Sequence, residues 1–183
     1  MTFVEELASA EIGGTFNFYR DGERAAVLCD RLAAYLEARA DAPLLLVGEA
    51  PGYRGARVSG IPFTSERQLT GSGPAEATAT IVRSALEELE LEERVLCWNV
   101  VPTHPGTPLS NRRPTRAEVE AGLPFANRLA RGRRVLAVGR LAHAALGAPY
   151  VRHPSHGGRA DFRAGLLRFA AGGQRVRRFS VAT

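Results

Sequence analysis

Short apolar runs alternate along this chain with longer amphipathic segments, and this alternation limits the folds open to it. Four runs have the length and flanking turn residues of buried strands, at residues 44–47, 95–101, 135–138 and 150–152. The segments before and between them carry apolar residues at helical spacing, at residues 23–40, 74–90, 115–129 and 140–146. Alternation of this kind is typical of parallel strands joined by crossover helices. We therefore predict an α/β fold, a three-layer α/β/α sandwich around a central four-stranded parallel sheet.

The chain is long enough for one domain. Its 183 residues match the usual size of a single globular unit. We expect residues 1–183 to form that unit, with residues 1–40 as an N-terminal helical cover and residues 44–162 as the core that carries the motifs. Thr115 stands three residues before Glu118, a capping-box pattern that predicts where the helix at 115–129 begins.

The basic residues favour a polyanionic partner. The net charge is +5, and all 24 basic residues are arginine. Guanidinium groups bind phosphates through paired hydrogen bonds, so this charge balance suits a nucleic acid. A genomic bias against lysine explains the absence of lysine equally well, but it does not explain the net positive charge.

Several protein classes are excluded by what the sequence lacks. No apolar run is long enough to span a membrane, and residues 1–11 carry acids where an export signal carries basic residues. We therefore expect a cytoplasmic protein with no membrane partner. Cys29 and Cys97 are too few for a four-cysteine metal site, and we expect both to be buried thiols. The glycine patterns of nucleotide-binding loops are missing as well, so we expect no cofactor and no metal.

Three segments fit neither strand nor helix and are predicted to be loops. They span residues 49–73, 102–114 and 153–158. Long loops in compact domains are usually functional, and each of these follows the C-terminal end of a predicted parallel strand. Open α/β sheets bind ligands at that edge. The sequence therefore predicts one crevice that the three loops surround.

These loops contain polar residues with more than one interpretation. Glu49 lies in a turn of small residues, Gly48 to Gly52, that would hold its carboxylate at a strand tip. Asn99 stands in an apolar strand, so its amide is either a structural link to a neighbouring loop or a reader of a ligand. His153 and His156 argue against a metal site, because Pro154 disfavours a helix between them and no further ligand lies nearby.

In this order and spacing, the motifs resemble those of the uracil-DNA glycosylase superfamily. The closest branch has a G-E-A-P-G first motif. The resemblance rests on residues 48–52, 60–63, 99–101 and 153–155, and it extends into residues 111–115, 123–125 and 138–142. It covers residues 44–162. It implies a monomer that acts on DNA containing uracil or another deaminated base.

The resemblance also implies a role for each motif residue in hydrolysis of an N-glycosidic bond. Phe63 would stack on a flipped base, Asn99 would pair with the amide edge of the base, and Ala50 would contact the base. His153 would donate a hydrogen bond to the carbonyl oxygen that gains charge as the bond breaks. Glu49 would orient or deprotonate the attacking water. Each of two residues also has a purely structural alternative: Phe63 could be an ordinary core residue, and Glu49 could cap a loop or helix.

A second group of residues is implied in binding the DNA strand. Ser155 and backbone amides of the first and third loops would hold phosphates, and arginine would add charge. His156 occupies the position at which relatives insert a residue into the duplex. The full group is Gly48, Pro51, Gly52, Tyr53, Pro154, Ser155, His156, Gly157 and Arg159.

The chain departs from this branch at three places. Iron–sulfur members carry a cysteine shortly after the strand asparagine, where residues 102–104 here read Pro-Thr-His, so no cluster is expected. The branch that cleaves uracil fastest has an aspartate where Ala50 stands, so activity would rest on Glu49. Residues 64–67 read Thr-Ser-Glu-Arg where the branch has a glycine-rich continuation, and the sequence assigns them no role. The expected function is removal of uracil from DNA; the alternatives are removal of hypoxanthine or xanthine, and binding of nucleic acid without effective catalysis.

Overall fold

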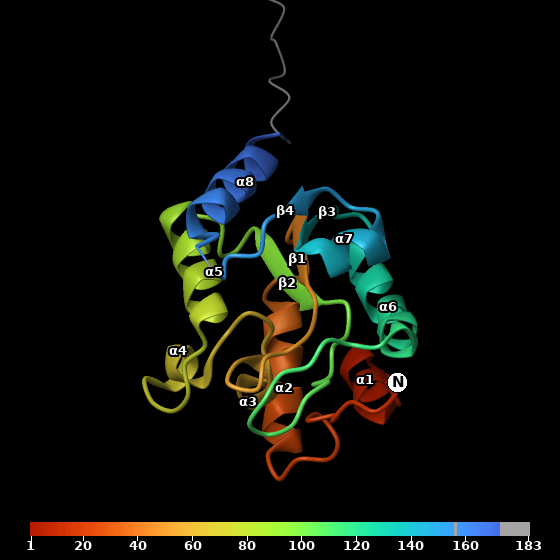
Figure 1. Cartoon of the computed structure of the whole chain (residues 1–183). Helices are drawn as coiled ribbons and strands as arrows, with labels where there is room; N and C mark the ends of the chain where they lie inside the picture. The colour runs from red at the N-terminus through yellow and green to blue at the C-terminus, as the bar shows by residue number, and fades with distance from the viewer. Residues whose placement is uncertain (156, 173–183) are drawn as a thin grey trace, which may run out of the picture.

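A central sheet of four parallel strands organises the molecule (Figure 1). The computed structural model describes residues 1–155 and 157–172. The strands are β1 (Leu44–Gly48), β2 (Val95–Asn99), β3 (Arg134–Val138) and β4 (Tyr150–Val151), in the order β2-β1-β3-β4. In register, Gly48 lies opposite Asn99, and Val138 lies opposite Val151. The predicted four-stranded parallel sheet is confirmed.

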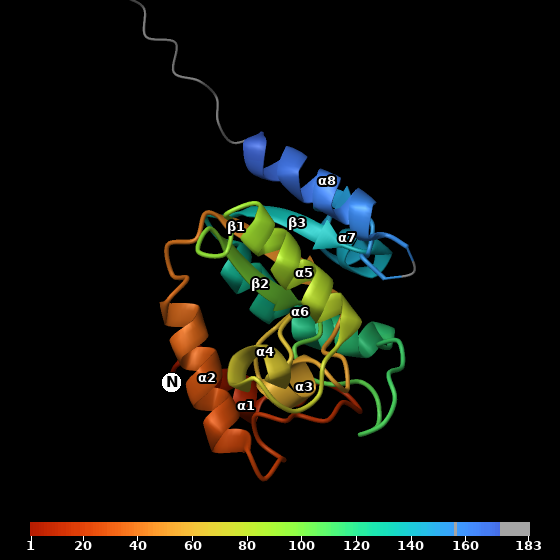
Figure 2. The ribbon, with the colours of Figure 1, turned by 90° about the vertical axis from the view of Figure 1, so that its left-hand side faces the viewer.

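Helices cover both faces of the sheet, as the three-layer prediction requires. Figures 1 and 2 show α5 (Ala77–Glu88) and α8 (Arg159–Ala171) on one face, and α6 (Arg116–Ala130) and α7 (Arg140–Leu146) on the other. The other helices are α1 (Phe3–Ser9), α2 (Ala25–Glu37), α3 (Ala56–Ser59) and α4 (Glu66–Thr70). None of the helices in residues 1–155 and 157–172 is long and apolar enough to cross a membrane.

The N-terminal segment packs against the β2 edge of the sheet. Helix α2 buries Leu28, Leu32 and Tyr35. The Tyr35 hydroxyl accepts a hydrogen bond of 2.7 Å from the backbone N–H of Cys97 on the edge strand β2. A backbone donor on a sheet edge needs such a partner when it is buried. Residues 1–40 thus supply two helices, α1 and α2.

The two cysteines differ in exposure. The Cys97 thiol is buried, as predicted, and burial raises its pKa to about 11. The prediction for Cys29 is wrong, because this thiol is only partly buried; it donates a hydrogen bond of 3.2 Å to the backbone oxygen of Tyr19. Both thiols are free, and neither lines the cavity described below.

Element boundaries differ from the predictions where the strands reach the site. The run at 95–101 stays a strand only to Asn99, but the amides of Val100 and Val101 still donate to the backbone oxygens of Gly48 and Glu49, at 2.9 and 3.0 Å. The first loop was predicted without regular structure but contains the short helices α3 and α4. Helix α4 is stabilised by a capping box at Ser65. The capping box at Thr115 is confirmed. These bonds bring the ends of β1 and β2 together beneath the three loops.

Candidate active site

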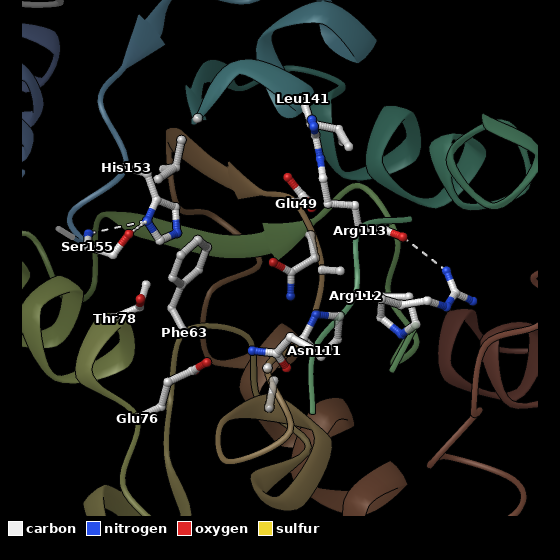
Figure 3. A pocket seen from close by; sticks show the side chains of 18 of the residues that line it. Glu49, Phe63, Glu76, Thr78, Asn111, Arg112, Arg113, Leu141, His153 and Ser155 are labelled. Atoms are coloured by element: carbon white, nitrogen blue, oxygen red, sulfur yellow. Dashed lines mark hydrogen bonds between the residues drawn. The ribbon is translucent and has the colours of Figure 1, made fainter. Parts of the chain in front are cut away.

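A cavity of about 580 Å³ opens at the C-terminal edge of the sheet. Its volume lies within the range of about 300–1,000 Å³ that is usual for small-molecule pockets. Figure 3 shows side chains from all three loops facing it. Among the residues that line it are Glu49, Ala50, Pro51, Gly52, Phe63, Glu76, Asn99, Asn111, Arg113, Arg140, His153 and Ser155. The predicted crevice therefore exists, and the three loops surround it.

Phe63 forms one wall of the cavity from an unusual backbone conformation. Its φ is +53°, in the left-handed region that residues other than glycine rarely adopt. Such conformations persist where surrounding contacts fix them, and they gather at functional sites. The ring lies against the backbone of Gly48, where a β-carbon would overlap its Cζ atom. The absence of a side chain at position 48 therefore leaves the space that the ring occupies at the end of β1.

Residues 64–67 hold the Phe63 loop in place. The buried carboxylate of Glu66 pairs with Arg24, at 2.9 Å, and with Arg31, at 2.8 Å, both from the α2 region. These guanidinium groups, Arg31 first, lower the pKa of Glu66. The Ser65 hydroxyl accepts a hydrogen bond of 2.9 Å from the backbone N–H of Glu76. The segment that the sequence left unexplained thus anchors the loop to α2 and to the start of α5.

Asn99 places its amide in the cavity at the end of β2. The residue is only 4% exposed. Its side chain makes no hydrogen bond with any residue that the structure describes, although it lines the cavity. The buried polar side-chain atoms that lack a partner in the described chain are Arg57 Nε and Trp98 Nε1, and the Asn99 amide is not among them, so it is open to the cavity and to a ligand there. Of the two interpretations that the sequence left open, this geometry supports the reader of a ligand.

Glu49 stands at the end of β1, half-buried on the cavity wall. Burial raises the pKa of its carboxyl group, and the nearby charge of Arg113 partly offsets that effect. Figure 3 shows Glu49 and Arg113 on the same side of the cavity, opposite Glu76. A carboxylate with a raised pKa in a pocket is a candidate proton acceptor.

His153 has a defined orientation on the opposite wall. Its Nδ1 atom lies 2.7 Å from the Ser155 hydroxyl and accepts a hydrogen bond of 3.3 Å from the Ser155 backbone N–H. Because an N–H group can only donate, Nδ1 is the acceptor, and the proton of the neutral ring is on Nε2. His153 is thus set to act as a hydrogen-bond donor through Nε2.

Two hydrogen bonds fasten the first loop to the second. The buried His104 ring places Nδ1 at 2.8 Å from the Pro51 backbone oxygen. The Asn111 side-chain oxygen accepts a hydrogen bond of 2.9 Å from the Tyr53 backbone N–H. The His104 ring therefore joins the second loop directly to the first.

An ion pair then fastens the second loop to α6. The Arg112 guanidinium donates to both oxygens of Glu118, at 2.8 and 2.6 Å. The Glu118 carboxylate also caps α6 by accepting a hydrogen bond of 2.8 Å from the Thr115 N–H. Arg112, together with these bonds, holds the pKa of Glu118 at about 2. The wall that carries Asn111 and Arg113 is therefore fixed at its base.

Glu76 brings a second carboxylate to the cavity, which the sequence analysis did not identify. It lies so close to Gly52 and Gly55 that a β-carbon at either position would overlap its carboxylate. Burial raises the pKa of Glu76. No motif precedes it, so only the fold could place it opposite Glu49.

The predicted site residues divide into two groups. Those that line the cavity are Glu49, Ala50, Pro51, Gly52, Phe63, Asn99, His153 and Ser155. Gly48, Tyr53, Pro154, Gly157 and Arg159 do not line it, and Arg159 instead pairs with Glu88 on α5 at 3.3 Å. His156 lies outside the described residues. Six further polar residues line the cavity without having been predicted from the sequence, although residues 111–115 and 138–142 carry part of the resemblance: Glu76, Thr78, Asn111, Arg112, Arg113 and Arg140.

Metal ligands do not gather in the described part of the chain. Within residues 1–155 and 157–172, no three His, Cys, Asp or Glu side chains form a group that could hold a metal ion. The polar groups of the cavity are one imidazole, two carboxylates, two hydroxyl groups, amides and guanidinium groups. Such groups suit binding of a polar planar molecule and proton transfer.

Comparisons with known proteins give the family. The model of the uracil DNA glycosylase superfamily matches residues 36–172. A similar solved structure is wild-type SMUG2 of Pedobacter heparinus, with a TM-score of 0.62 and 14% identity, over 94% of this chain and 97% of that one. No match is found among curated proteins. Because the family model covers most of the sequence, the chain belongs to the uracil DNA glycosylase superfamily.

Proposed function

We propose that this protein is a DNA glycosylase that removes uracil from DNA after flipping the nucleotide out of the duplex. One observation carries the proposal: Phe63, Asn99, His153 and Glu49, from separate segments of the chain, face a single cavity. Enzymes that act on a base within DNA must take it into such a pocket. The proposed chemistry requires these four side chains to reach the same bound nucleotide, and a shared cavity allows that.

Recognition of the base rests on two side chains. The Phe63 ring offers a flat apolar surface on which a flipped base can stack. The carboxamide of Asn99 offers one donor and one acceptor, which match the adjacent carbonyl and N–H of uracil. Cytosine presents the reverse order on that edge, so an amide held in the orientation that suits uracil would be left unpaired. Discrimination follows from that cost.

Cleavage assigns separate tasks to His153 and Glu49. As the N-glycosidic bond breaks, its electron pair leaves with the base, and negative charge grows on a carbonyl oxygen of the base. The Nε2–H of His153 would donate a hydrogen bond to that oxygen. The water oxygen forms the new bond to the sugar carbon, and the Glu49 carboxylate orients the water and accepts its proton. No cofactor is needed in this scheme.

The positive side chains around the cavity suit the phosphates of the substrate. Arg113 and Arg140 both line it, whereas the guanidinium of Arg112 is engaged with Glu118. Phosphate contacts position a DNA strand without reading its sequence. We propose that Arg113 and Arg140, with the Ser155 hydroxyl, hold the strand on both sides of the flipped nucleotide, and that the protein acts as a monomer in the cytoplasm.

A direct assay tests the proposal. An oligonucleotide with one uracil is incubated with excess protein, treated with alkali to break abasic sites, and separated by size. We expect cleavage at the uracil position only. Strands that stay intact at high excess of protein would overturn the proposal, and binding without cleavage would favour a nucleic-acid-binding protein without effective catalysis.

A second candidate function keeps the chemistry and changes the base. Ala50 presents only a methyl group to the cavity, at the position where the branch most active on uracil has an aspartate. Hypoxanthine or xanthine would then be the substrate. Oligonucleotides that carry each lesion, compared under single-turnover conditions, separate the two functions by the ratio of their cleavage rates.

A further inference from the structure

Glu76 brings to the cavity a carboxyl group that has no task in the removal of uracil. It stands at the N-cap of α5, where a side chain usually accepts a hydrogen bond from the first turn of the helix. The Glu76 side chain makes no such bond and lies on the cavity wall instead, opposite Glu49 (Figure 3). It forms no hydrogen bond or ion pair with any residue in 1–155 or 157–172. The carboxyl group is therefore open to a ligand.

The first loop is shaped around this carboxyl group. A β-carbon at Gly52 or at Gly55 would overlap it, so the absence of side chains at these two positions leaves the space that it occupies. The backbone of Glu76 is fixed as well, because its N–H donates a hydrogen bond of 2.9 Å to the Ser65 hydroxyl. The carboxyl group thus has one defined place on the wall of the cavity.

Burial keeps the Glu76 carboxyl group protonated to higher pH than usual. It raises the pKa of this group, and no nearby charge offsets the effect, whereas Arg113 partly offsets it at Glu49. In the loop against which Glu76 packs, the Arg54 guanidinium lies over the Tyr53 ring, with its central carbon 5.4 Å from the ring centre. A protonated carboxyl group in a pocket is a candidate general acid. The charged or titratable side chains that share the cavity with Glu76 are Glu49, Arg112, Arg113, Arg140 and His153.

His153 and Glu76 lie at opposite ends of the Phe63 side chain, as Figure 3 shows. A base that stacks on the Phe63 ring therefore has the Nε2–H donor of His153 at one edge and the carboxyl group of Glu76 at the other. Uracil offers a carbonyl oxygen to His153, but its opposite edge carries only hydrogens bound to carbon. The placement of the two side chains therefore suits a base with hydrogen-bonding atoms on both edges.

Hypoxanthine, a 6-oxopurine, presents such atoms at matching positions. Its O6 and N1–H offer Asn99 the same order of acceptor and donor as O4 and N3–H of uracil. Its N3 and N7 atoms are acceptors on opposite edges, so N3 at His153 places N7 toward Glu76. Adenine reverses the order at Asn99, and the amino group of guanine would direct its donors at the His153 donor. A cavity of about 580 Å³ also has room for the two fused rings of hypoxanthine.

We propose that Glu76 is the catalytic acid with which this glycosylase removes hypoxanthine, by giving its proton to N7 of the flipped base. The inference rests on the proposed function, because it uses the same cavity and the same Phe63, Asn99 and Glu49. It adds a second base to uracil, and it assigns a task to a side chain that uracil leaves unused.

Proton transfer to N7 makes the purine a better leaving group. The proton of Glu76 moves to N7 while the bond between N9 and the sugar carbon breaks, and the electron pair of that bond stays on the base. The base leaves as a neutral molecule, and Glu76 is left as a carboxylate. The water oxygen bonds to the sugar carbon, and the water gives its proton to Glu49. Both side chains return to their starting states by exchanging protons with the solvent.

The test compares Glu76→Gln with Glu87→Gln, which changes an exposed carboxylate on the same helix that does not line the cavity. Single-turnover cleavage is measured on duplexes that differ only in carrying one hypoxanthine or one uracil. Glutamine keeps the shape of the side chain and can donate a hydrogen bond to N7, but it cannot transfer a proton. We expect Glu76→Gln to lower the ratio of the hypoxanthine rate to the uracil rate by about 100-fold or more, and Glu87→Gln to keep the wild-type ratio. An unchanged ratio for Glu76→Gln overturns the inference.

The pH–rate profile separates a catalytic acid from a residue that only shapes the cavity. The protonated form of Glu76 is the active one, so the wild-type rate on hypoxanthine should fall as the pH rises through the pKa of Glu76, which burial raises. The uracil rate should show no such fall, and neither should the residual hypoxanthine rate of Glu76→Gln. A fall that persists in Glu76→Gln overturns the inference, because another group would then be the acid.

The two substrates also separate this inference from the proposed function. Cleavage at hypoxanthine that depends on Glu76, without cleavage at uracil, would retain the inference and reject uracil removal as the function. Cleavage at uracil alone would retain the proposed function and overturn the inference.

Discussion

The ring of Phe63 covers the backbone of Gly48 so closely that a β-carbon at position 48 would overlap the ring and lie 2.9 Å from the Asn99 side-chain oxygen. The glycine therefore sets the position of two proposed base-binding groups at once. It does so without lining the cavity itself, from the end of the strand behind them.

Gly48→Ala should disable the site while leaving the fold intact. The added methyl group pushes the ring and the amide out of position, and a shift of about 1 Å can cost about 100-fold in rate. Cleavage of uracil-containing DNA by the variant gives the measurement. Gly22→Ala, whose β-carbon would meet only ordinary contacts of 3.6 Å and more, should behave as the wild type. A fully active Gly48→Ala would mean that the ring is not needed where it lies.

Glu49→Gln should lower the cleavage rate by about 100-fold or more, because the amide cannot accept a proton from water. Uracil-containing DNA should still bind, since the shape of the side chain is kept. Single-turnover rates and binding by fluorescence anisotropy measure the two effects. The control is Glu120→Gln, an exposed carboxylate on α6 paired with Arg116. Unchanged cleavage by Glu49→Gln would remove this residue from the mechanism.

Arg113→Gln should move the acid side of the pH–rate profile to higher pH. The carboxylate form of Glu49 is the active one, so the rate falls as the pH drops through its pKa, which burial raises and Arg113 lowers. Removing the guanidinium charge leaves burial unopposed, and the pKa of Glu49 rises further. Arg116→Gln removes an exposed charge elsewhere and should leave the profile in place. A profile that does not move would show that another group sets the acid side.

Asn99→Ala should weaken the preference for uracil over cytosine by about 1–3 kcal/mol, which is roughly 5- to 150-fold in relative rate. The reason is that the amide no longer pairs with the base edge. Rates on otherwise identical oligonucleotides with uracil or cytosine, at enzyme excess, give the ratio. Equal ratios for variant and wild type would assign the amide a structural role instead.

Glu118→Gln should destabilise the protein at neutral pH by about 1–3 kcal/mol, because a charged hydrogen-bonded pair with Arg112 is lost. The pKa of about 2 lies below the usual carboxyl value of 4.5, so the ionised group stabilises the fold above pH 4.5, and this contribution is lost as the pH falls toward 2. Urea unfolding at pH 7 and pH 3 measures both proteins. The difference between them should shrink at pH 3, and a constant difference would count against this account.

Strands and motif residues could be predicted from the sequence because their signals are local. The apolar runs at 44–47 and 135–138 predict buried strands. Asn99 and His153 stand at the ends of strands, and a parallel sheet brings these ends to one edge. The capping box of Thr115 and Glu118 predicts the start of α6 in the same way.

The supporting contacts could not be predicted, because their partners lie far apart in the chain. Glu66 pairs with Arg31, which stands 35 positions earlier on a helix that shows no motif. Glu76 reaches the cavity only because α5 begins beside Gly52. His104 stands within a loop of four prolines, and nothing in its neighbourhood indicates that its ring would bond to Pro51.

The walls of the cavity are fastened to different supports: Glu66 ties the first loop to α2, and Glu118 ties the second loop to α6. The pKa values of Glu66 and Glu118 are lowered, whereas burial raises that of Glu49, so mild acid protonates Glu49 first and leaves both ion pairs charged. Loss of catalysis and loss of the fold are thus separate events on acidification. We therefore expect a protein kept in mild acid to lose its cleavage activity while its secondary structure stays intact. Transfer to neutral buffer should restore the activity.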